Sequence, residues 1–109
     1  MTERAETLLT DIADAVKRIE EFTAEIKNFG EYSADLKSKS DVERQLIIIG
    51  EAVNKLIQEE QFILNEAEKI ISFRNRLAHA YDSIDDSIVW LIIKRHLPQL
   101  KNEITEILK

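Results

Sequence analysis

The sequence predicts an all-α protein, folded as an up-and-down bundle of four to five helices in one domain that spans residues 1–109. Three observations support this fold class. The 109 residues include only two glycines and one proline, the residue types that most often interrupt helices. Apolar residues recur at steps of three and four over long stretches. The chain is long enough for one hydrophobic core and too short for two.

The first predicted helix runs from Ala5 to Ile26. Its apolar positions form one continuous stripe, which needs a partner helix along its length: Ala5, Leu8, Leu9, Ile12, Val16, Ile19, Phe22 and Ile26. We expect this helix to end near Phe29 and Gly30, because glycine readily adopts the left-handed conformation that stops a helix. The segment 31–39 is expected to be a connector with at most one helical turn, and Tyr32 is assigned to packing.

The second helix is predicted to start at Ser40, because Ser40 and Glu43 have the spacing of a capping box. Gly50, in the middle of this helix, costs about 1 kcal/mol relative to alanine. We therefore expect a neighbouring helix to approach closely there. The next residue, Glu51, is either an ordinary exposed carboxylate, which is the commoner outcome, or a group that orients an active-site arginine.

Two more helix starts and one interruption follow. Asn65, with Glu68 three positions later, predicts the start of a third helix. Asp85 or Ser83 is expected to cap a fourth. Pro98 cannot donate a backbone hydrogen bond, so a kink or a fresh helix is expected there, followed by a short last helix.

Composition limits the possible functions. The net charge of −6 argues against a non-specific nucleic-acid binder. The charge is uneven: residues 1–68 hold 8 basic and 16 acidic side chains, net −8, and residues 69–109 hold 7 and 5, net +2. An RNA partner, if there is one, is therefore expected to meet the C-terminal part, although for the charge alone an ordinary solvated surface is the preferred interpretation.

Several other classes of protein are excluded or disfavoured. The lack of cysteine excludes disulfides and zinc–thiolate sites, and the two histidines do not have the spacing of a metal-ligand pair. We expect no metal and no cofactor. The charged start does not resemble a signal peptide, and the longest apolar run, Ile88–Ile93, is too short to span a bilayer. These features predict a soluble, cytoplasmic protein with no membrane partner.

The segment from Arg74 to Tyr81 contains two arginines, an asparagine, a histidine and a tyrosine within eight residues. At about 100° per residue, Arg74 and Tyr81 share one helical stripe, while His79 lies about 140° from Arg74. A regular helix therefore does not bring the three together. Either the helix ends near His79 and the backbone turns, or two chains contribute to one site.

These residue types suit metal-independent cleavage of RNA, in which the ribose 2′-hydroxyl attacks the neighbouring phosphate. The reaction needs a base, an acid and positive charge beside the phosphate. Histidine can act as acid or base near neutral pH, and arginine offers a permanent charge with forked donors. His96, beside Lys94 and Arg95, is assigned instead to an interaction with the carbonyls at a helix end.

Three stretches, Glu43–Ala52, Ile71–Tyr81 and Ile88–Pro98, together resemble the HepT-like branch of the HEPN superfamily. The resemblance covers roughly the last two thirds of the chain in order. It implies a dimer-forming helical fold and a ribonuclease toxin of a toxin–antitoxin pair. The partner in such pairs is MntA, a minimal nucleotidyltransferase that acts as the antitoxin.

The resemblance also assigns roles to individual residues. Arg74 and His79 match the catalytic arginine and histidine, and Asn75 matches the polar residue that supports them. Tyr81 matches the tyrosine that the antitoxin modifies with AMP, which would place bulk and negative charge at the mouth of the cleft. Ala80 departs from the glycine that relatives often carry.

Further candidates complete the predicted site. Glu51 is a supporting candidate, and Arg76, Lys94 and Arg95 are candidates for RNA binding. Two alternatives to the nuclease remain open. One is a catalytically idle adaptor that binds a nucleotidyltransferase or nucleotide. The other is a plain helical dimer, in which Arg74 pairs with a carboxylate and His79 is a core or cap residue.

Overall fold

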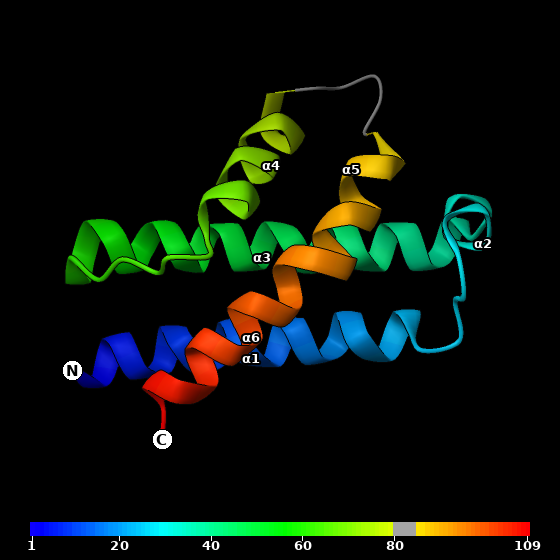
Figure 1. Cartoon of the computed structure of the whole chain (residues 1–109). Helices are drawn as coiled ribbons and strands as arrows, with labels where there is room; N and C mark the ends of the chain where they lie inside the picture. Colours follow the sequence, from blue (N-terminus) through cyan, green and yellow to red (C-terminus); the bar gives the residue numbers. More distant parts are fainter. Residues whose placement is uncertain (80–84) are drawn as a thin grey trace.

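The computed structural model describes residues 1–79 and 85–109, with the side chains of residues 1–75 and 85–109. All regular structure in this part is helical (Figure 1), which confirms the predicted all-α fold class. The elements are α1 Glu3–Thr23, α2 Phe29–Ala34, α3 Leu36–Glu60, α4 Glu68–His79, α5 Asp86–Leu91, the π-helical turn η1 Ile92–His96, and α6 Leu97–Ile107. Tyr81 lies outside the described residues.

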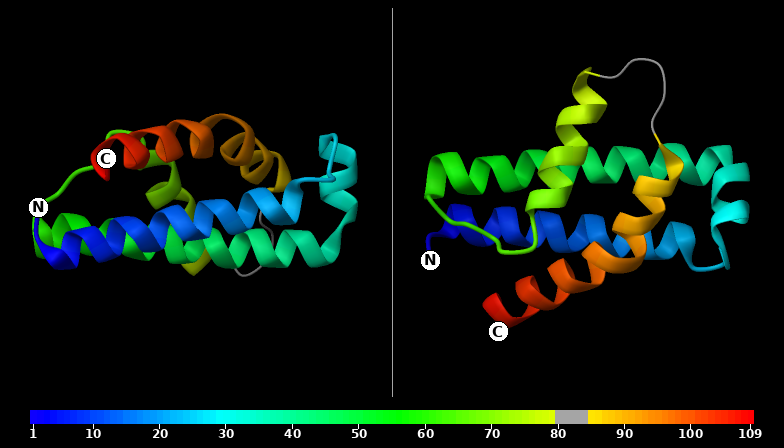
Figure 2. Two further views of the ribbon diagram at one scale, coloured as in Figure 1. Left: turned by 90° about the horizontal axis from the view of Figure 1, so that it is seen from below. Right: turned by 45° about the horizontal axis from the view of Figure 1, so that its top comes forward.

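Helices α1 and α3 form a long antiparallel pair, and α4 crosses α3 while α6 crosses α1 (Figure 2). The predicted stripe of α1 is buried, and Leu9, Ile12 and Ile19 are 0% exposed. Helix α1 thus packs along α3, the partner helix that its long apolar stripe required. It ends at Thr23, three residues before the predicted end at Ile26.

The prediction for Phe29 and Gly30 was wrong, because these residues begin helix α2 rather than end α1. The side chain of Asn28 caps α2 by accepting a hydrogen bond of 2.9 Å from the backbone amide of Glu31. Tyr32 in this helix is fully buried, and its ring stacks on Trp90 with 5.4 Å between centroids. The packing role predicted for Tyr32 is confirmed.

Helix α3 begins at Leu36, so the predicted start at Ser40 was wrong. Asp35 caps this helix, and its carboxylate accepts a hydrogen bond of 3.0 Å from the amide of Ser38. Ser40 and Glu43 therefore lie inside a helix that is already formed. Local spacing could not distinguish the two starts, because aspartate and serine are equally good caps.

Helix α4 begins at Glu68, three residues after the predicted cap at Asn65. The backbone amides of Asn65 and Glu66 donate instead to the carboxylate of Glu103 on α6, at 2.8 and 3.1 Å. A residue 38 positions away thus satisfies amides that a local cap was expected to satisfy. The prediction failed because this partner is brought in by tertiary structure.

The last three elements form one continuous helical path. Asp85 caps α5, as predicted, and accepts a hydrogen bond from the amide of Ser87 at 2.9 Å. The interruption expected at Pro98 occurs just before it, as a π-helical turn in which the amide of Leu97 donates to the carbonyl of Ile92. Because the helix continues beyond His96, the predicted interaction of His96 with terminal carbonyls was wrong. Within the described residues, no helix is both long and apolar enough to cross a membrane.

Candidate active site on α4

Gly50 lies where α4 crosses α3. A Cβ atom built at Gly50 would lie 2.6 Å from Cβ of Arg74 and 2.7 Å from its Cγ. Carbon atoms in contact are normally about 3.5–4.0 Å apart, so a larger residue at position 50 would force the two helices to shift. The close helix approach predicted at Gly50 is confirmed, and the residue that makes it is the candidate catalytic arginine.

Arg74 is half-buried, with the first carbons of its side chain against the backbone of α3. Its Nη1 atom donates a hydrogen bond of 3.1 Å to Oδ1 of the exposed Asn75. None of the carboxylates in the described ranges forms an ion pair with Arg74. The packed stem restricts where the guanidinium can reach, and its charge remains available for an anion.

Asn75 and Glu51 are placed differently. Asn75 contacts the guanidinium of Arg74, which fits the supporting position expected for it. Glu51 is exposed and lines a groove of about 240 Å³ between α1 and α3, together with Asp11 and Lys55. Among the described residues no ion pair joins Glu51 to Arg74, and the supporting role of Glu51 stays a prediction.

Helix α4 carries Arg74, Asn75 and, as its last residue, His79. Five residues of an α-helix rise about 7.5 Å and turn through about 140°. On a regular helix, positions 74 and 79 therefore do not share a face. The side chains of Arg76 and His79, and all of Tyr81, lie outside the described part of the chain.

Lys94 and Arg95 are exposed on η1. The ammonium of Lys94 lies 4.7 Å from the centroid of the Trp90 ring, a cation–π contact. Trp90 in turn stacks on the buried Tyr32. This arrangement holds the charge of Lys94 at a defined point on the surface, in the C-terminal part of the chain where positive charge predominates.

A polar cluster that the sequence did not predict holds the start of α5. The Nζ atom of Lys39 lies 2.9 Å from the carboxylate of Asp86, and both side chains are only 20% exposed. Ser33 contributes its carbonyl to Lys39 at 3.2 Å and its hydroxyl to Asp86 at 3.3 Å. The cluster joins α2, α3 and α5. It holds the first residue of α5 against the other two helices.

Two ionisable groups beside this cluster have shifted pKa values. Burial raises the pKa of the Glu43 carboxyl, and the negative charge of Asp86 raises it further, while Lys39 lowers it. Burial also holds the pKa of the Tyr32 phenol well above its usual value, with smaller effects of Glu43 and Asp86. Burial is the largest cause of both shifts, and the neighbouring carboxylates add to it.

The described residues contain no group of three or more histidine, cysteine, aspartate or glutamate side chains that could hold a metal ion. A family model described as "Ribonuclease HepT-like" matches residues 12–107, nearly the whole length of this chain. The chain belongs to the HepT-like ribonuclease family.

Individual relatives agree with this assignment. A protein of Thermococcus cleftensis named probable ribonuclease HepT is 35% identical over 103 residues, which is 93% of each chain. Two proteins of Methanocaldococcus jannaschii, named as candidate RNases, are 36% and 32% identical over 106 and 98 residues. These alignments cover 93% and 88% of this HepT-like chain, and 84% and 89% of the relatives. No solved structure matched.

Proposed function

We propose that this HepT-like protein is an endoribonuclease that cleaves RNA without a metal ion, with Arg74 and His79 as its catalytic residues. The observation that supports the proposal most strongly is the contact between Arg74 and Gly50. The mid-helix glycine leaves room for Arg74 to pack against α3. No described carboxylate forms an ion pair with this arginine. The family assignment, which rests on residues 12–107, supports RNA as the substrate.

The reaction is a transesterification. The ribose 2′-oxygen attacks the adjacent phosphorus, the bond from phosphorus to the 5′-oxygen breaks, and a 2′,3′-cyclic phosphate and a 5′-hydroxyl are formed. A histidine takes the proton of the 2′-hydroxyl, and an acid gives a proton to the leaving 5′-oxygen. Arg74 stabilises the negative charge that develops on the phosphate oxygens.

The site is proposed to form in a homodimer. One chain offers a single histidine in the motif, whereas two copies offer both a base and an acid. The angular separation of about 140° between Arg74 and His79 along one helix also favours a site in which each group meets groups of a second copy. A strictly monomeric protein that cleaved RNA would contradict this part of the proposal.

The protein is further proposed to be the toxin of a cytoplasmic toxin–antitoxin pair. A MntA-like nucleotidyltransferase would silence it by transferring AMP to the hydroxyl of Tyr81. Each AMP adds a negatively charged phosphodiester and a bulky nucleoside, which repel and obstruct an RNA strand. Tyr81 follows the α4 residues that carry the catalytic groups, so the modification would act directly at the cleft.

The deciding experiment is cleavage of total cellular RNA in EDTA by purified protein, after intact mass confirms that Tyr81 is unmodified. We expect the wild type to cleave, and the His79→Ala and Arg74→Ala variants to lose at least about 100-fold in rate. Arg18→Ala, which removes an exposed arginine from α1, is the matched control and should retain activity. No cleavage by folded, unmodified wild-type dimer would favour the non-catalytic adaptor instead.

A further inference from the structure

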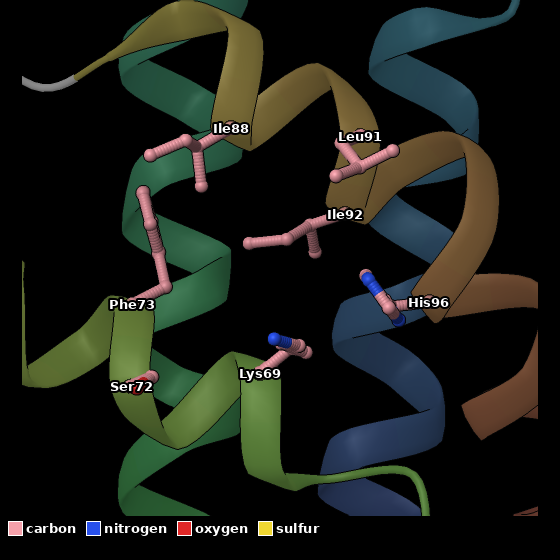
Figure 3. A pocket seen from close by; sticks show the side chains of 7 residues that line it. All are labelled: Lys69, Ser72, Phe73, Ile88, Leu91, Ile92 and His96. Carbon is pink, nitrogen blue, oxygen red and sulfur yellow. The ribbon is translucent and has the colours of Figure 1, made fainter.

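A cavity of about 240 Å³ lies between α4 and the helical path formed by α5 and η1 (Figure 3). Its lining combines apolar and polar side chains from α4, α5 and η1. The apolar residues are Phe73, Ile88, Leu91 and Ile92, and the polar residues are Lys69, Ser72 and His96. The lining is thus distinct from Arg74 and Asn75, the described members of the candidate active site.

The apolar side of the cavity is open to a ligand. Phe73 and Ile92 are 4% and 2% exposed and form its floor, whereas Leu91 is 45% exposed at its edge. In Figure 3 the side chains of Phe73, Ile88 and Ile92 point toward one another across the hollow. A flat apolar group placed there would bury surface that is now in contact with water.

The polar side is formed by Lys69 of α4 and His96 of η1. In Figure 3 both side chains border the hollow at the end away from Ile88. Within the residues that the structure describes, neither forms an ion pair with a carboxylate. An ammonium and an imidazole near each other, without a neutralising partner, suit a phosphate group.

The π-helical turn orients His96 toward this cavity. In an α-helix, residues four positions apart differ by about 40° in their direction around the axis. His96 would therefore be displaced from the face that carries Ile88 and Ile92. Hydrogen bonds in a π turn join residues five apart, as between Leu97 and Ile92 here, and this wider turn reduces the drift. All three side chains consequently line one cavity.

The cavity also lies within reach of the proposed cleavage site. Phe73 precedes His79 by six residues of the same helix, about 9 Å along its axis. A stacked nucleic-acid strand advances about 3.4 Å per nucleotide, so this distance corresponds to roughly three stacked nucleotides.

We propose that the cavity binds one nucleotide of the RNA strand, a few positions from the bond that is cut. The base lies against Phe73, Ile88 and Leu91, and its phosphate contacts Lys69 and His96. A nucleotide fits because it joins a flat, largely apolar face to a single negative charge. This inference rests on the proposed ribonuclease function and extends it to substrate selection. These apolar walls select a base by its shape and its stacking, so the subsite accepts several bases.

The test measures binding of a short single-stranded RNA with 2′-O-methyl groups, which cannot be cleaved by 2′-hydroxyl attack, to the full-length protein at several salt concentrations. Lys69→Met combined with His96→Gln should weaken binding about 10-fold. The slope of log affinity against log salt should fall by about 0.7 for each phosphate that the variant no longer neutralises. Leu91→Ser should weaken binding with an unchanged slope, because it removes only an apolar side chain. Thermal unfolding of each variant confirms that it is folded.

Lys17→Met, which removes an exposed lysine of α1, is the charge-matched control and should bind as the wild type does. Equal affinity and slope in the Lys69/His96 variant, an equal loss in the control, or no RNA binding by the wild type would each overturn the inference. AMP that binds as tightly as the oligonucleotide would also overturn it, since the cavity would then be a site for free nucleotide. Binding differences as expected, combined with no cleavage of ordinary RNA, would refute only the proposed catalysis.

Discussion

Gly50→Ala is the most direct test of the site. The added methyl group favours the helical conformation of α3, but it collides with the side chain of Arg74. The added Cβ would meet Cβ and Cγ of Arg74 at 2.6 and 2.7 Å. The Cβ atom is fixed to the backbone of α4 and cannot rotate away, so α4 must move by about 1 Å to restore normal contact. Alanine gains about 1 kcal/mol in helix propensity, whereas overpacking costs about 1–3 kcal/mol. We expect a net loss of about 1 kcal/mol in the free energy of unfolding.

The effect on catalysis should be larger than the effect on folding. A displacement of about 1 Å at a catalytic group can cost about 100-fold in rate. Urea unfolding and RNA cleavage by Gly50→Ala would measure the two effects on the same protein. A variant that is more stable than the wild type by about 1 kcal/mol, as helix propensity alone predicts, and that cleaves RNA normally would refute the reasoning.

A double-mutant cycle isolates the interaction itself. Arg74→Gly removes the carbon atoms that the new methyl group would strike, at the cost of a glycine in α4. If the overlap is the cause, Gly50→Ala should be destabilising in the wild type and stabilising in the Arg74→Gly background. The expected coupling energy is at least about 1 kcal/mol. A coupling energy near zero would mean that α4 does not press on α3 at this point.

Three further predictions concern the cluster that holds the start of α5. Because the pKa of Glu43 is raised in the folded state, the carboxylate opposes folding as pH rises through its titration range. Glu43→Gln should therefore be more stable than the wild type at pH 7, with the difference fading toward pH 4 in urea unfolding; an advantage of equal size at both pH values would contradict this. Lys39→Met should destabilise the protein by about 1–3 kcal/mol, because it leaves the Asp86 carboxylate half-buried without its ammonium. An unchanged melting temperature would show that the pair contributes nothing. Tyr32→Phe should stabilise the protein by about 1 kcal/mol in thermal unfolding, because the buried hydroxyl has no partner among the described residues, and a clear loss of stability would mean that this hydroxyl is bonded in solution.

The helix boundaries show which structural features a short stretch of sequence cannot predict. Apolar periodicity located the long helices, because a stripe that must be buried leaves a strong pattern in the sequence. Helix α2 was expected to be part of a connector, and the start of α3 was misplaced because Asp35 competes with Ser40, an equally good cap. Such choices depend on which start allows the whole helix to pack, and no short window contains that information.

For the candidate site, too, some features could be predicted from the local sequence and others depended on the tertiary structure. The motif from Arg74 to Tyr81, the need for close approach at Gly50 and the family resemblance could all be predicted from residue types and spacing. The position of Glu51 in a separate groove and the cluster of Lys39 with Asp86 could not. Each of these arrangements brings together residues of different helices, and no local sequence pattern links those helices.

The sequence by itself determined that this protein is helical and which family it resembles, since these properties follow from local periodicity and from a short motif. Only the tertiary structure decided that Arg74 is the residue seated on Gly50. It also decided that Lys69 and His96 border one cavity. The reason is physical: side chains far apart in the chain meet only after the apolar stripes have chosen their partners and fixed the angles at which the helices cross.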